Sequence, residues 1–289
     1  MKIIRYKNEG ISNIGILTEI DGKSFVSKLK VDHIDDLFTM NEGELEKLYE
    51  DAKFTEPQIE SETVEFEPVI IRPNQDVICL GINYAAHAIE SARFKKEAFG
   101  KERKKPIYFS KRVNRFVGDK EVIDGHFDIV DSLDYEAELA VIIGKPAKNV
   151  SASDAKEYIF GYTILNDMSA RNLQTEHIQW YFGKSLDDFT PLGPAIVTRD
   201  EFSFPPELDI KSYVNGELRQ NSNTRMLITS ISEIIAELSK GITLMPGTII
   251  ATGTPEGVGM GFVPPNFLNK GDEVACYIEG IGTITNKIK

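Results

Sequence analysis

Hydrophobic and polar positions alternate over short stretches along most of the chain, the pattern expected of half-buried β-strands. Gly, Pro, Asn and Asp separate these stretches, and few apolar runs have the spacing of a long helix. Asp21-Gly22 and Asn215-Gly216 each lie between two strand patterns, as two-residue hairpin turns do. The regular strand–helix alternation of a doubly wound sheet is missing, so we expect an α+β, mainly β fold.

Capping signals predict the few helices. A polar helical stretch covers residues 41–51, and Asn83 can cap a short helix that carries His87 and Glu90. Ser230-Ile231-Ser232-Glu233 is a capping box for another helix, which Gly241 can end. Pro246-Gly247 then turns into a strand over residues 248–252.

The start of the chain differs from the remainder. Two short strands and a polar helix come first, and a connector follows over residues 60–68. Strand and turn signals become dense beyond Pro73. We therefore predict a small N-terminal domain, residues 1–72, and a main domain, residues 73–289.

Composition limits the classes of partner. The net charge of −12 opposes general attraction to nucleic acid or an anionic membrane, so neither is expected as a partner. The apolar runs are too short to span a bilayer, and the first residues lack an apolar signal region. Cys79 and Cys276 lie in strand patterns as structural thiols, which suits a cytoplasmic protein. The basic run over residues 95–105 is interpreted as a solvated loop or helix face.

Glu136 and Glu138 are two residues apart at the start of an otherwise apolar strand pattern. With a period of two, both share a face with Asp134, while Tyr135 and its alternate neighbours face the core. Clustered carboxylates that point into a cleft need a cation or a raised pKa. The alternative is that these carboxylates lie on the solvent-exposed face of an edge strand, which is the more common situation for an isolated Glu-x-Glu.

A third carboxylate, Asp167, follows the strand pattern over residues 161–166 and lies 29 residues beyond Glu138. A strand that returns through a crossover can lie beside its predecessor and bring Asp167 to the same place. Three carboxylates suit Mg²⁺, Mn²⁺ or Ca²⁺, whereas zinc lacks His or Cys ligands here. Alternatively, Asp167 caps the helix that follows.

Other candidate chemistry is less specific. His87 and Glu90 share a helix face, so they are either a general base with its orienting carboxylate or an exposed pair. The glycine-rich stretch over residues 252–259 can place backbone N–H groups near an anion or form a plain turn. It lacks the Walker and Rossmann spacings. Without further context, Lys184 would be interpreted as a surface residue.

Several strings, taken together and in order, resemble the fumarylacetoacetate hydrolase family over roughly residues 75–289. These strings are Asn83-Tyr84-Ala85-Ala86-His87-Ala88-Ile89-Glu90, Asp134-Tyr135-Glu136-Ala137-Glu138-Leu139-Ala140, Asn166-Asp167-Met168-Ser169-Ala170-Arg171-Asn172-Leu173-Gln174, Gly183-Lys184-Ser185, Pro191-Leu192-Gly193-Pro194, Val214-Asn215-Gly216-Glu217-Leu218-Arg219-Gln220 and Ala251-Thr252-Gly253-Thr254-Pro255-Glu256-Gly257-Val258-Gly259.

The resemblance implies the family's mixed β-roll, with a small N-terminal α/β domain, and usually a homodimer. Glu136, Glu138 and Asp167 match the metal ligands, with Mg²⁺ as the expected ion and Mn²⁺ or Ca²⁺ as alternatives. The catalytic positions of the family are matched by His87, Glu90 and Lys184. Its substrate-binding positions are matched by Gln174, Thr254, Gly253 and Arg171.

Two positions depart from the family pattern. The loop Gly81-Ile82-Asn83-Tyr84 lacks the metal-binding Asp of the eukaryotic fumarylacetoacetate hydrolases, which argues against fumarylacetoacetate as the substrate. Asn172 stands where many members have Asp, a change that we do not expect to affect the metal directly.

The resemblance is greatest to acylpyruvate-hydrolase-like and 2-hydroxyhepta-2,4-diene-1,7-dioate-isomerase-like members, so the expected substrate is a small 2-oxo acid. We expect hydrolysis of a C–C bond in an acylpyruvate-type 2,4-dioxo acid, for example a fumarylpyruvate-like one, through a metal-stabilised pyruvate enolate. His87, held by Glu90, would activate the water, and the pocket would lie between Lys184 and residues 94–99.

The same enolate also serves isomerisation of hydroxymuconate-type diacids, decarboxylation of oxaloacetate, and hydrolysis or dehydration of 2-oxo sugar acids. These reactions are the alternatives within the family. A metal-binding scaffold without catalysis is the alternative outside the enzymes.

Overall fold

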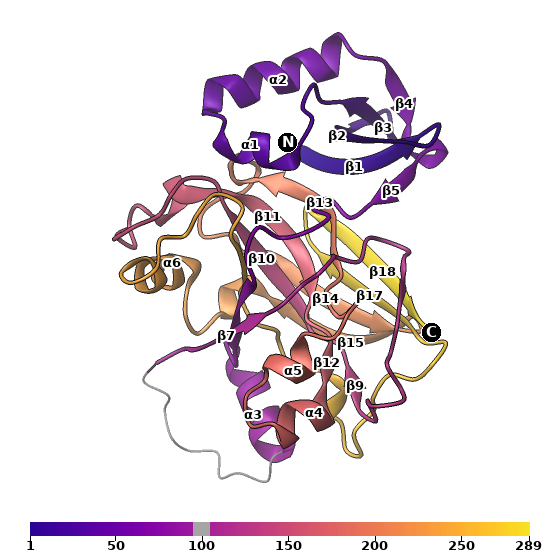
Figure 1. Ribbon diagram of the computed structural model, residues 1–289, viewed down its shortest axis with the longest axis vertical. Helices are drawn as coiled ribbons and strands as arrows, with labels where there is room; N and C mark the ends of the chain where they lie inside the picture. The colour runs from indigo at the N-terminus through magenta and orange to yellow at the C-terminus, as the bar shows by residue number, and fades with distance from the viewer. Residues whose placement is uncertain (95–104) are drawn as a thin grey trace.

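The computed structural model describes residues 1–94 and 105–289 (Figure 1). Strands dominate its regular structure and form two large sheets and one two-stranded sheet, so the predicted mainly β, α+β fold is confirmed. Most of the basic run, residues 95–104, and the pocket segment 95–99 lie outside the described residues. Among the described residues, no helix has the length and apolar character needed to cross a bilayer.

The larger sheet runs from the N-terminal strands into the body of the protein, in the order β4-β3-β2-β1-β13-β11-β10-β16-β6-β7, with β5 paired to β1. Its neighbours are antiparallel except for β16 and β6. The strands are β1 (Lys2–Asn8), β2 (Ile11–Ile20), β3 (Lys23–Lys28), β4 (Gln58–Glu60), β5 (Glu65–Glu67), β6 (Val77–Gly81), β7 (Ile107–Lys111), β10 (Ala137–Ile143), β11 (Ile159–Asn166), β13 (Leu192–Thr198) and β16 (Ile249–Ala251).

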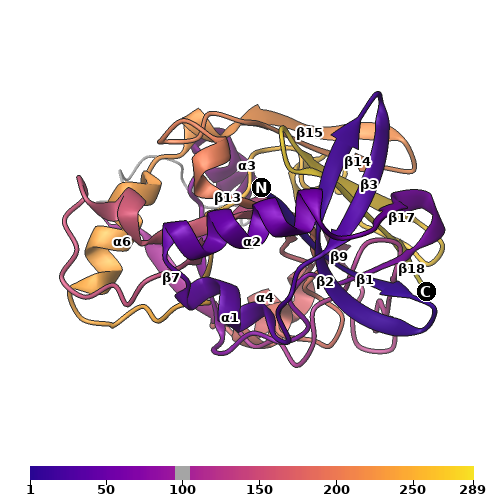
Figure 2. The same ribbon diagram turned by 90° about the horizontal axis from the view of Figure 1, so that it is seen from above.

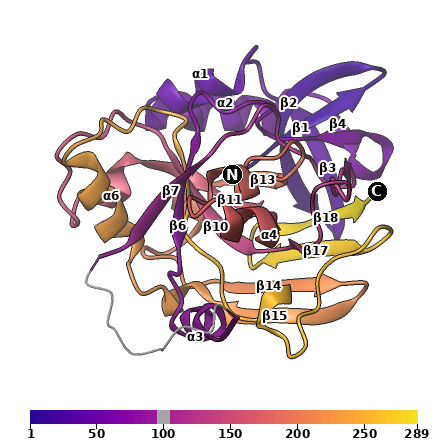
Figure 3. The same cartoon turned by 60° about the horizontal axis from the view of Figure 1, so that its bottom comes forward.

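A second sheet packs against this one and has the order β15-β14-β17-β18-β8. Val141 and Tyr162 of the first sheet share one hydrophobic cluster with Ile210 and Cys276 of the second, so the main core lies between two layers. Figure 3 shows the second sheet beside β10 and β11. The strands are β8 (Val122–Ile123), β14 (Asp209–Val214), β15 (Glu217–Asn223), β17 (Glu273–Ile278) and β18 (Gly282–Ile288), while β9 (Leu133–Asp134) pairs with β12 (Ser169–Ala170).

Helices are short and lie around the sheets. The helices α1 and α2 cover the N-terminal end (Figure 2), whereas α3, α4 and α5 gather at the opposite end (Figure 1). The predicted capping box at Ser230 and Glu233 is confirmed at the start of α6. The helices are α1 (Ile34–Thr39), α2 (Glu42–Phe54), α3 (Ala85–Phe94), α4 (Arg171–Glu176), α5 (Tyr181–Lys184) and α6 (Ile231–Ser239), with 3₁₀ turns η1 (Ser61–Thr63), η2 (Ala155–Tyr158), η3 (Arg199–Glu201), η4 (Thr224–Met226) and η5 (Gly259–Gly261).

Both predicted hairpin turns are confirmed. Asp21 and Gly22 join β2 to β3 with φ of 50° and 77°, and Asn215 and Gly216 join β14 to β15 with φ of 52° and 80°. Positive φ at both central residues gives the turn a twist that matches the twist of the flanking strands. Asn and Asp adopt this conformation more readily than other non-glycine residues, which explains the choice of residues here.

The N-terminal strands are joined to the body rather than separated from it. Lys2 and Ile3 of β1 pair with β13, and Leu37 and Phe38 of α1 share a hydrophobic cluster with Ile142 of β10. One sheet therefore passes through both predicted domains. The division at residues 72 and 73 stays a prediction.

Strand β10 explains why the acidic residues lie where they do. All its residues from Ala137 to Ile143 are buried, with Leu139 and Val141 in the main core and Ala140 and Ile142 in a second cluster on the other face. Hydrophobic packing on both faces leaves room for carboxylates only where the strand begins. The candidate metal-binding carboxylates of β10 therefore lie at one end of the sheet.

Candidate metal centre and active-site pocket

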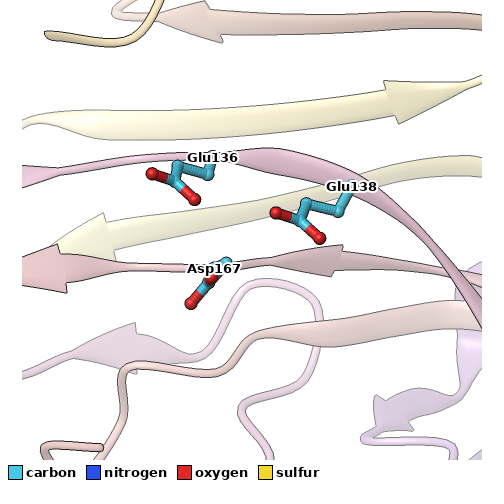
Figure 4. Close-up of side chains that lie close together, drawn as sticks. All are labelled: Glu136, Glu138 and Asp167. Atoms are coloured by element: carbon cyan, nitrogen blue, oxygen red, sulfur yellow. The ribbon is translucent and has the colours of Figure 1, made fainter. Parts of the chain in front are cut away.

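The three predicted metal ligands come together at the end of the β10–β11 pair. Ala137 pairs with Asn166, and Asp167 N donates to Glu136 O at 2.8 Å, which extends the ladder by one step and places the two acids side by side. Glu138 projects on the same side as Glu136 (Figure 4). One ligand atom from each of the three carboxylates lies within 4.8 Å of the other two, and all three residues are buried. The local pairing of β10 and β11 thus assembles the centre.

Three buried cations surround these acids. Lys184 Nζ bridges Glu136 Oε2 at 2.8 Å and Asp167 Oδ2 at 2.6 Å, and Lys111 Nζ lies 2.5 Å from Asp167 Oδ1. Arg171 Nη2 lies 2.6 Å from Glu136 Oε1 in an ion pair that lacks hydrogen-bond geometry. Glu136 and Asp167 therefore each have two cationic neighbours.

Glu138 is the exception. Its Oε2 accepts a hydrogen bond from Gly253 N at 2.8 Å, and no ion pair compensates its charge among the described residues. Burial, together with the charges of Asp167 and Glu136, raises the pKa of Glu138 well above its usual value. Burial would also raise the pKa of Glu136, but Lys184 and Arg171 outweigh burial and lower it.

This donor set fits a divalent cation that prefers oxygen ligands. The ligands are carboxylate oxygens only, which suits Mg²⁺, Mn²⁺ or Ca²⁺. Four buried carboxyl groups, Asp134 included, face three buried cations, so Glu138 is left without a cationic partner. A bound divalent ion would supply that partner, favour the ionised form of Glu138 and leave the centre positive, which favours an anionic substrate.

The predicted dyad lies on α3, near the metal centre. His87 is 4% exposed, and its Nδ1 makes a long contact of 3.5 Å with Glu90 Oε2. Glu90 Oε1 accepts from Gly257 N at 2.9 Å, so the carboxylate is held from both sides. The side chain of Asn83, expected to cap this helix, instead hydrogen-bonds Thr229 and Thr252. It therefore ties the start of α3 to the loop after β16.

One cavity of about 720 Å³ brings most of the predicted residues together. Glu90, Asp167 and Gly253 are not among the residues that line it. Phe94, at the start of the predicted pocket segment, lines it as well. The predicted residues on its wall are His87, Glu136, Glu138, Arg171, Gln174, Lys184 and Thr254.

The predicted substrate-binding residues also support the metal ligands. Gln174 Oε1 accepts from Arg171 Nη1 at 3.1 Å. Thr254 Oγ1 donates to Ala137 O at 2.9 Å and accepts from Gln220 at 2.7 Å. Since this hydroxyl already has two partners, a substrate would meet the backbone or methyl group of Thr254 more readily. The assignment of these residues to substrate binding stays a prediction.

Aromatic side chains form another wall of the cavity. The rings of Phe109 and Trp180 meet edge to face with centroids 5.2 Å apart, and Lys184 Nζ lies 5.4 Å from the centroid of Phe109. Phe94 and Phe267 form a similar pair at 6.3 Å. The pocket therefore has a charged floor and an apolar side.

Sequence reasoning missed Lys111 and Gln220. Lys111 is fully buried at the end of β7, and Gln220 is fully buried on β15, where it donates to Thr254 and Pro255 and accepts from Ala137 N. Gln220 closes a motif that carried the family resemblance, which was a usable signal. Lys111 had no comparable signal, because a lysine at the end of a strand is usually solvated.

Comparison with known proteins agrees with this architecture. Residues 76–289 match the family described as fumarylacetoacetate (FAA) hydrolase, C-terminal. The oxaloacetate tautomerase YisK of Bacillus subtilis is 45% identical over 225 residues, which cover 78% of this chain and 73% of that protein.

Two solved structures are similar along the whole chain. A fumarylacetoacetate hydrolase from Exiguobacterium antarcticum has a TM-score of 0.84 and 36% identity, covering 100% of this chain and 99% of that one. Maleylpyruvate hydrolase from Sphingobium sp. SYK-6, solved with manganese(II) and pyruvate, has a TM-score of 0.78 and 29% identity, covering 100% and 98%. The chain belongs to the fumarylacetoacetate hydrolase family.

Proposed function

We propose that this protein is a divalent-metal-dependent enzyme that moves a proton at C3 of a short 2-oxo acid, and that its reaction is the keto–enol interconversion of oxaloacetate. The observation that carries the proposal is the position of His87, paired with Glu90, on the wall of the cavity that Glu136 and Glu138 also line. The 45% identity to an oxaloacetate tautomerase favours this reaction over the others open to an enolate-forming site.

Glu136, Glu138 and Asp167 would hold the cation. When bound, it supplies a Lewis acid that draws electron density toward the 2-oxo oxygen of the substrate and so acidifies C3. Lys184 holds Glu136 and Asp167 in place through its two contacts and offsets their negative charge. Arg171 does the same for Glu136 from the other side.

His87 carries the proton. With its Nδ1–H directed at Glu90 Oε2, the neutral imidazole leaves Nε2 as the acceptor. Nε2 takes the C3 proton, the C–H electron pair becomes the C2–C3 double bond, and the π pair of the former carbonyl moves onto its oxygen. That oxygen takes a proton from water to complete the enol, and the imidazolium returns its proton to solvent. Proton transfer by a positioned side chain such as His87 contributes about 10²–10⁴-fold, and Glu90 stabilises the imidazolium while it holds the proton.

Hydrolysis of an acylpyruvate is the second candidate, and the aromatic wall favours it. A four-carbon acid would leave much of the 720 Å³ cavity unfilled, whereas an acyl group could pack against Phe109 and Trp180. In that reaction His87 would deprotonate a water rather than C3. The maleylpyruvate hydrolase solved with pyruvate supports the same alternative.

The test is C3 hydrogen exchange in D₂O, followed by NMR, together with the decay of the oxaloacetate enol and pyruvate release from acylpyruvates. We expect Mg²⁺- or Mn²⁺-dependent exchange and enol interconversion, with His87→Ala lowering both at least 100-fold. Exchange and interconversion that persist unchanged in His87→Ala would refute the role of the base. Pyruvate release without enol interconversion would favour the hydrolase. A homodimer stays a prediction, which light scattering can check.

A further inference from the structure

The 3₁₀ turn η5 lies between two carboxylates, the fully buried Asp134 on one side and the partly buried Glu90 on the other. Gly259 N donates to Asp134 Oδ1 at 2.6 Å, and Met260 N donates to Asp134 Oδ2 at 3.1 Å. A Cβ on Gly259 would lie 2.7 Å from Asp134 Oδ1, and a Cβ on Gly261 would lie 2.3 Å from Glu90 Oε1. A Cβ on Gly259 would also lie 2.7 Å from the backbone oxygen of Asn266, so that end has no room for a side chain, whereas a Cβ on Gly261 would force the Glu90 carboxylate to move.

Asp134 connects this turn to the metal centre. It is fully buried, and its Oδ2 accepts from Arg171 Nε at 2.9 Å. The same guanidinium places Nη2 2.6 Å from Glu136 Oε1. Arg171 is therefore shared between a carboxylate that holds η5 and a carboxylate of the metal centre. A change at Asp134 must alter the charge balance on Arg171 and hence on Glu136.

Glu90 connects the other end of the turn to the base. Its Oε2 contacts His87, its Oε1 accepts from Gly257 N, and α3 packs directly against η5. Met260, in the middle of the turn, lines the cavity between the two ends. A continuous set of contacts thus runs from Glu136 through Arg171, Asp134 and η5 to the dyad.

We propose that η5 is a positioning element that sets the His87–Glu90 dyad relative to the metal centre, with Asp134 as its anchor. This inference rests on the proposed role of His87 as the base. Proton transfer requires donor and acceptor at near hydrogen-bond distance, and a misplacement of about 1 Å can cost about 100-fold in rate. Asp134 and Arg171 act through other groups, so they are positioning residues.

The first test is Gly261→Ala. The added methyl displaces the Glu90 carboxylate and leaves the three metal ligands untouched. We expect kcat for C3 exchange to fall about 10- to 100-fold, with KM and the Mn²⁺ dissociation constant within two-fold of the wild type. Gly125→Ala is the matched control, because the atoms nearest to its Cβ all belong to the ring of Phe127, which is 41% exposed and does not line the cavity, so this change should alter none of these values.

A double-mutant cycle shows whether the turn acts through the dyad. If it does, Gly261→Ala lowers kcat less than two-fold further in a Glu90→Gln background, since both changes remove the same function. If the two losses multiply, the turn does not act through Glu90 and the proposal is wrong. Circular dichroism and thermal melting confirm that each variant is folded.

Asp134→Asn tests the other end of the connection. We expect the Mn²⁺ dissociation constant to rise at least three-fold and the ring ¹⁵N signals of His87 to shift, whereas Asp128→Asn, at an exposed site, changes neither. Wild-type metal affinity and an unchanged His87 signal in Asp134→Asn would overturn the coupling. If Asp134→Asn does not fold, the Gly261 and Glu90 cycle decides. A wild-type protein without turnover refutes the proposed function, while the His87 signal still tests this connection.

Discussion

Lys111 Nζ lies 2.5 Å from Asp167 Oδ1, and both side chains are fully buried. Burial lowers the pKa of Lys111, an effect that Asp167 opposes. Asp167 has a second cationic partner, Lys184, at 2.6 Å, whereas Asp167 is the carboxylate that pairs with Lys111. The contribution of the Lys111–Asp167 pair can be measured by removing one partner.

We expect Lys111→Met to destabilise the protein by about 3–5 kcal/mol, because it leaves part of the Asp167 charge buried without a partner. Urea denaturation of the chelator-treated protein measures the free energy of unfolding. The control is Lys105→Met, since Lys105 is 81% exposed and pairs with Glu237 at 3.1 Å. An exposed pair of this kind contributes at most about 1 kcal/mol. Equal effects of the two substitutions would contradict the prediction.

Glu136 and Glu138 should respond oppositely to conversion to Gln. Glu138→Gln replaces a buried carboxyl group that has no ion-pair partner and whose pKa is raised by burial, so the metal-free protein should be no less stable than the wild type. Glu136→Gln removes one of the two carboxylate partners of both Lys184 and Arg171, so it should destabilise the metal-free protein by about 3–5 kcal/mol. Both variants should lose Mn²⁺ binding in a calorimetric titration. A large loss of stability in Glu138→Gln would show that its charge is compensated after all.

Removal of the metal should abolish turnover reversibly. Chelation followed by desalting should leave a folded protein without C3-exchange activity, and Mg²⁺ or Mn²⁺ should restore it. Because the ion binds the folded state, a concentration 100 times the dissociation constant should add about 2.7 kcal/mol to the free energy of unfolding. Full activity in a preparation shown to be metal-free by elemental analysis would exclude the metal assignment.

Gln220 makes three hydrogen bonds that connect the metal-ligand strand to the loop after β16. It accepts from Ala137 N and donates to Thr254 Oγ1 and Pro255 O. Gln220→Glu keeps the acceptor for Ala137 N but loses the donors to Thr254 and Pro255. Each buried polar group left without a partner costs about 1–3 kcal/mol, so we expect a lower melting temperature. We also expect a several-fold drop in kcat/KM, since Thr254 adjoins Gly253 on the loop that holds Glu138. The exposed Asn221→Asp is the control, and an equal effect there would argue against a specific role.

Period-two alternation was sufficient to place Glu136 and Glu138 on one face and Tyr135 on the other, because side-chain direction in a strand depends only on position parity. Asp167 was harder, since its position depends on β11 returning beside β10 in register. Only the family resemblance made that register predictable. Asn83 could not be assigned from the sequence, because its amide could either cap the helix or hydrogen-bond distant loops. The tertiary fold determines which of these partners it has.

Lys111 and Asp134 show where prediction from the sequence ends. Lys111 reaches Asp167 because β7 pairs with β6 and β6 pairs with β16, a relationship between segments far apart in the chain. Asp134 was predicted to share the face of Glu136, yet its partners Gly259 and Met260 lie more than a hundred residues away. The charge of a buried residue can be understood only from neighbours that the fold supplies.

The pairing of β1 with β13 has a consequence for synthesis. Lys2 meets Val197, a separation of 195 residues in the chain. At a synthesis rate of about 5–20 residues per second, roughly 10 to 40 s pass between the synthesis of β1 and that of β13. Until then β5 can pair with residues 5–7 of β1, but the positions of Lys2 and Ile3 stay open to wrong partners. The contact that joins the two halves into one sheet is thus also one of the last that the nascent chain can make.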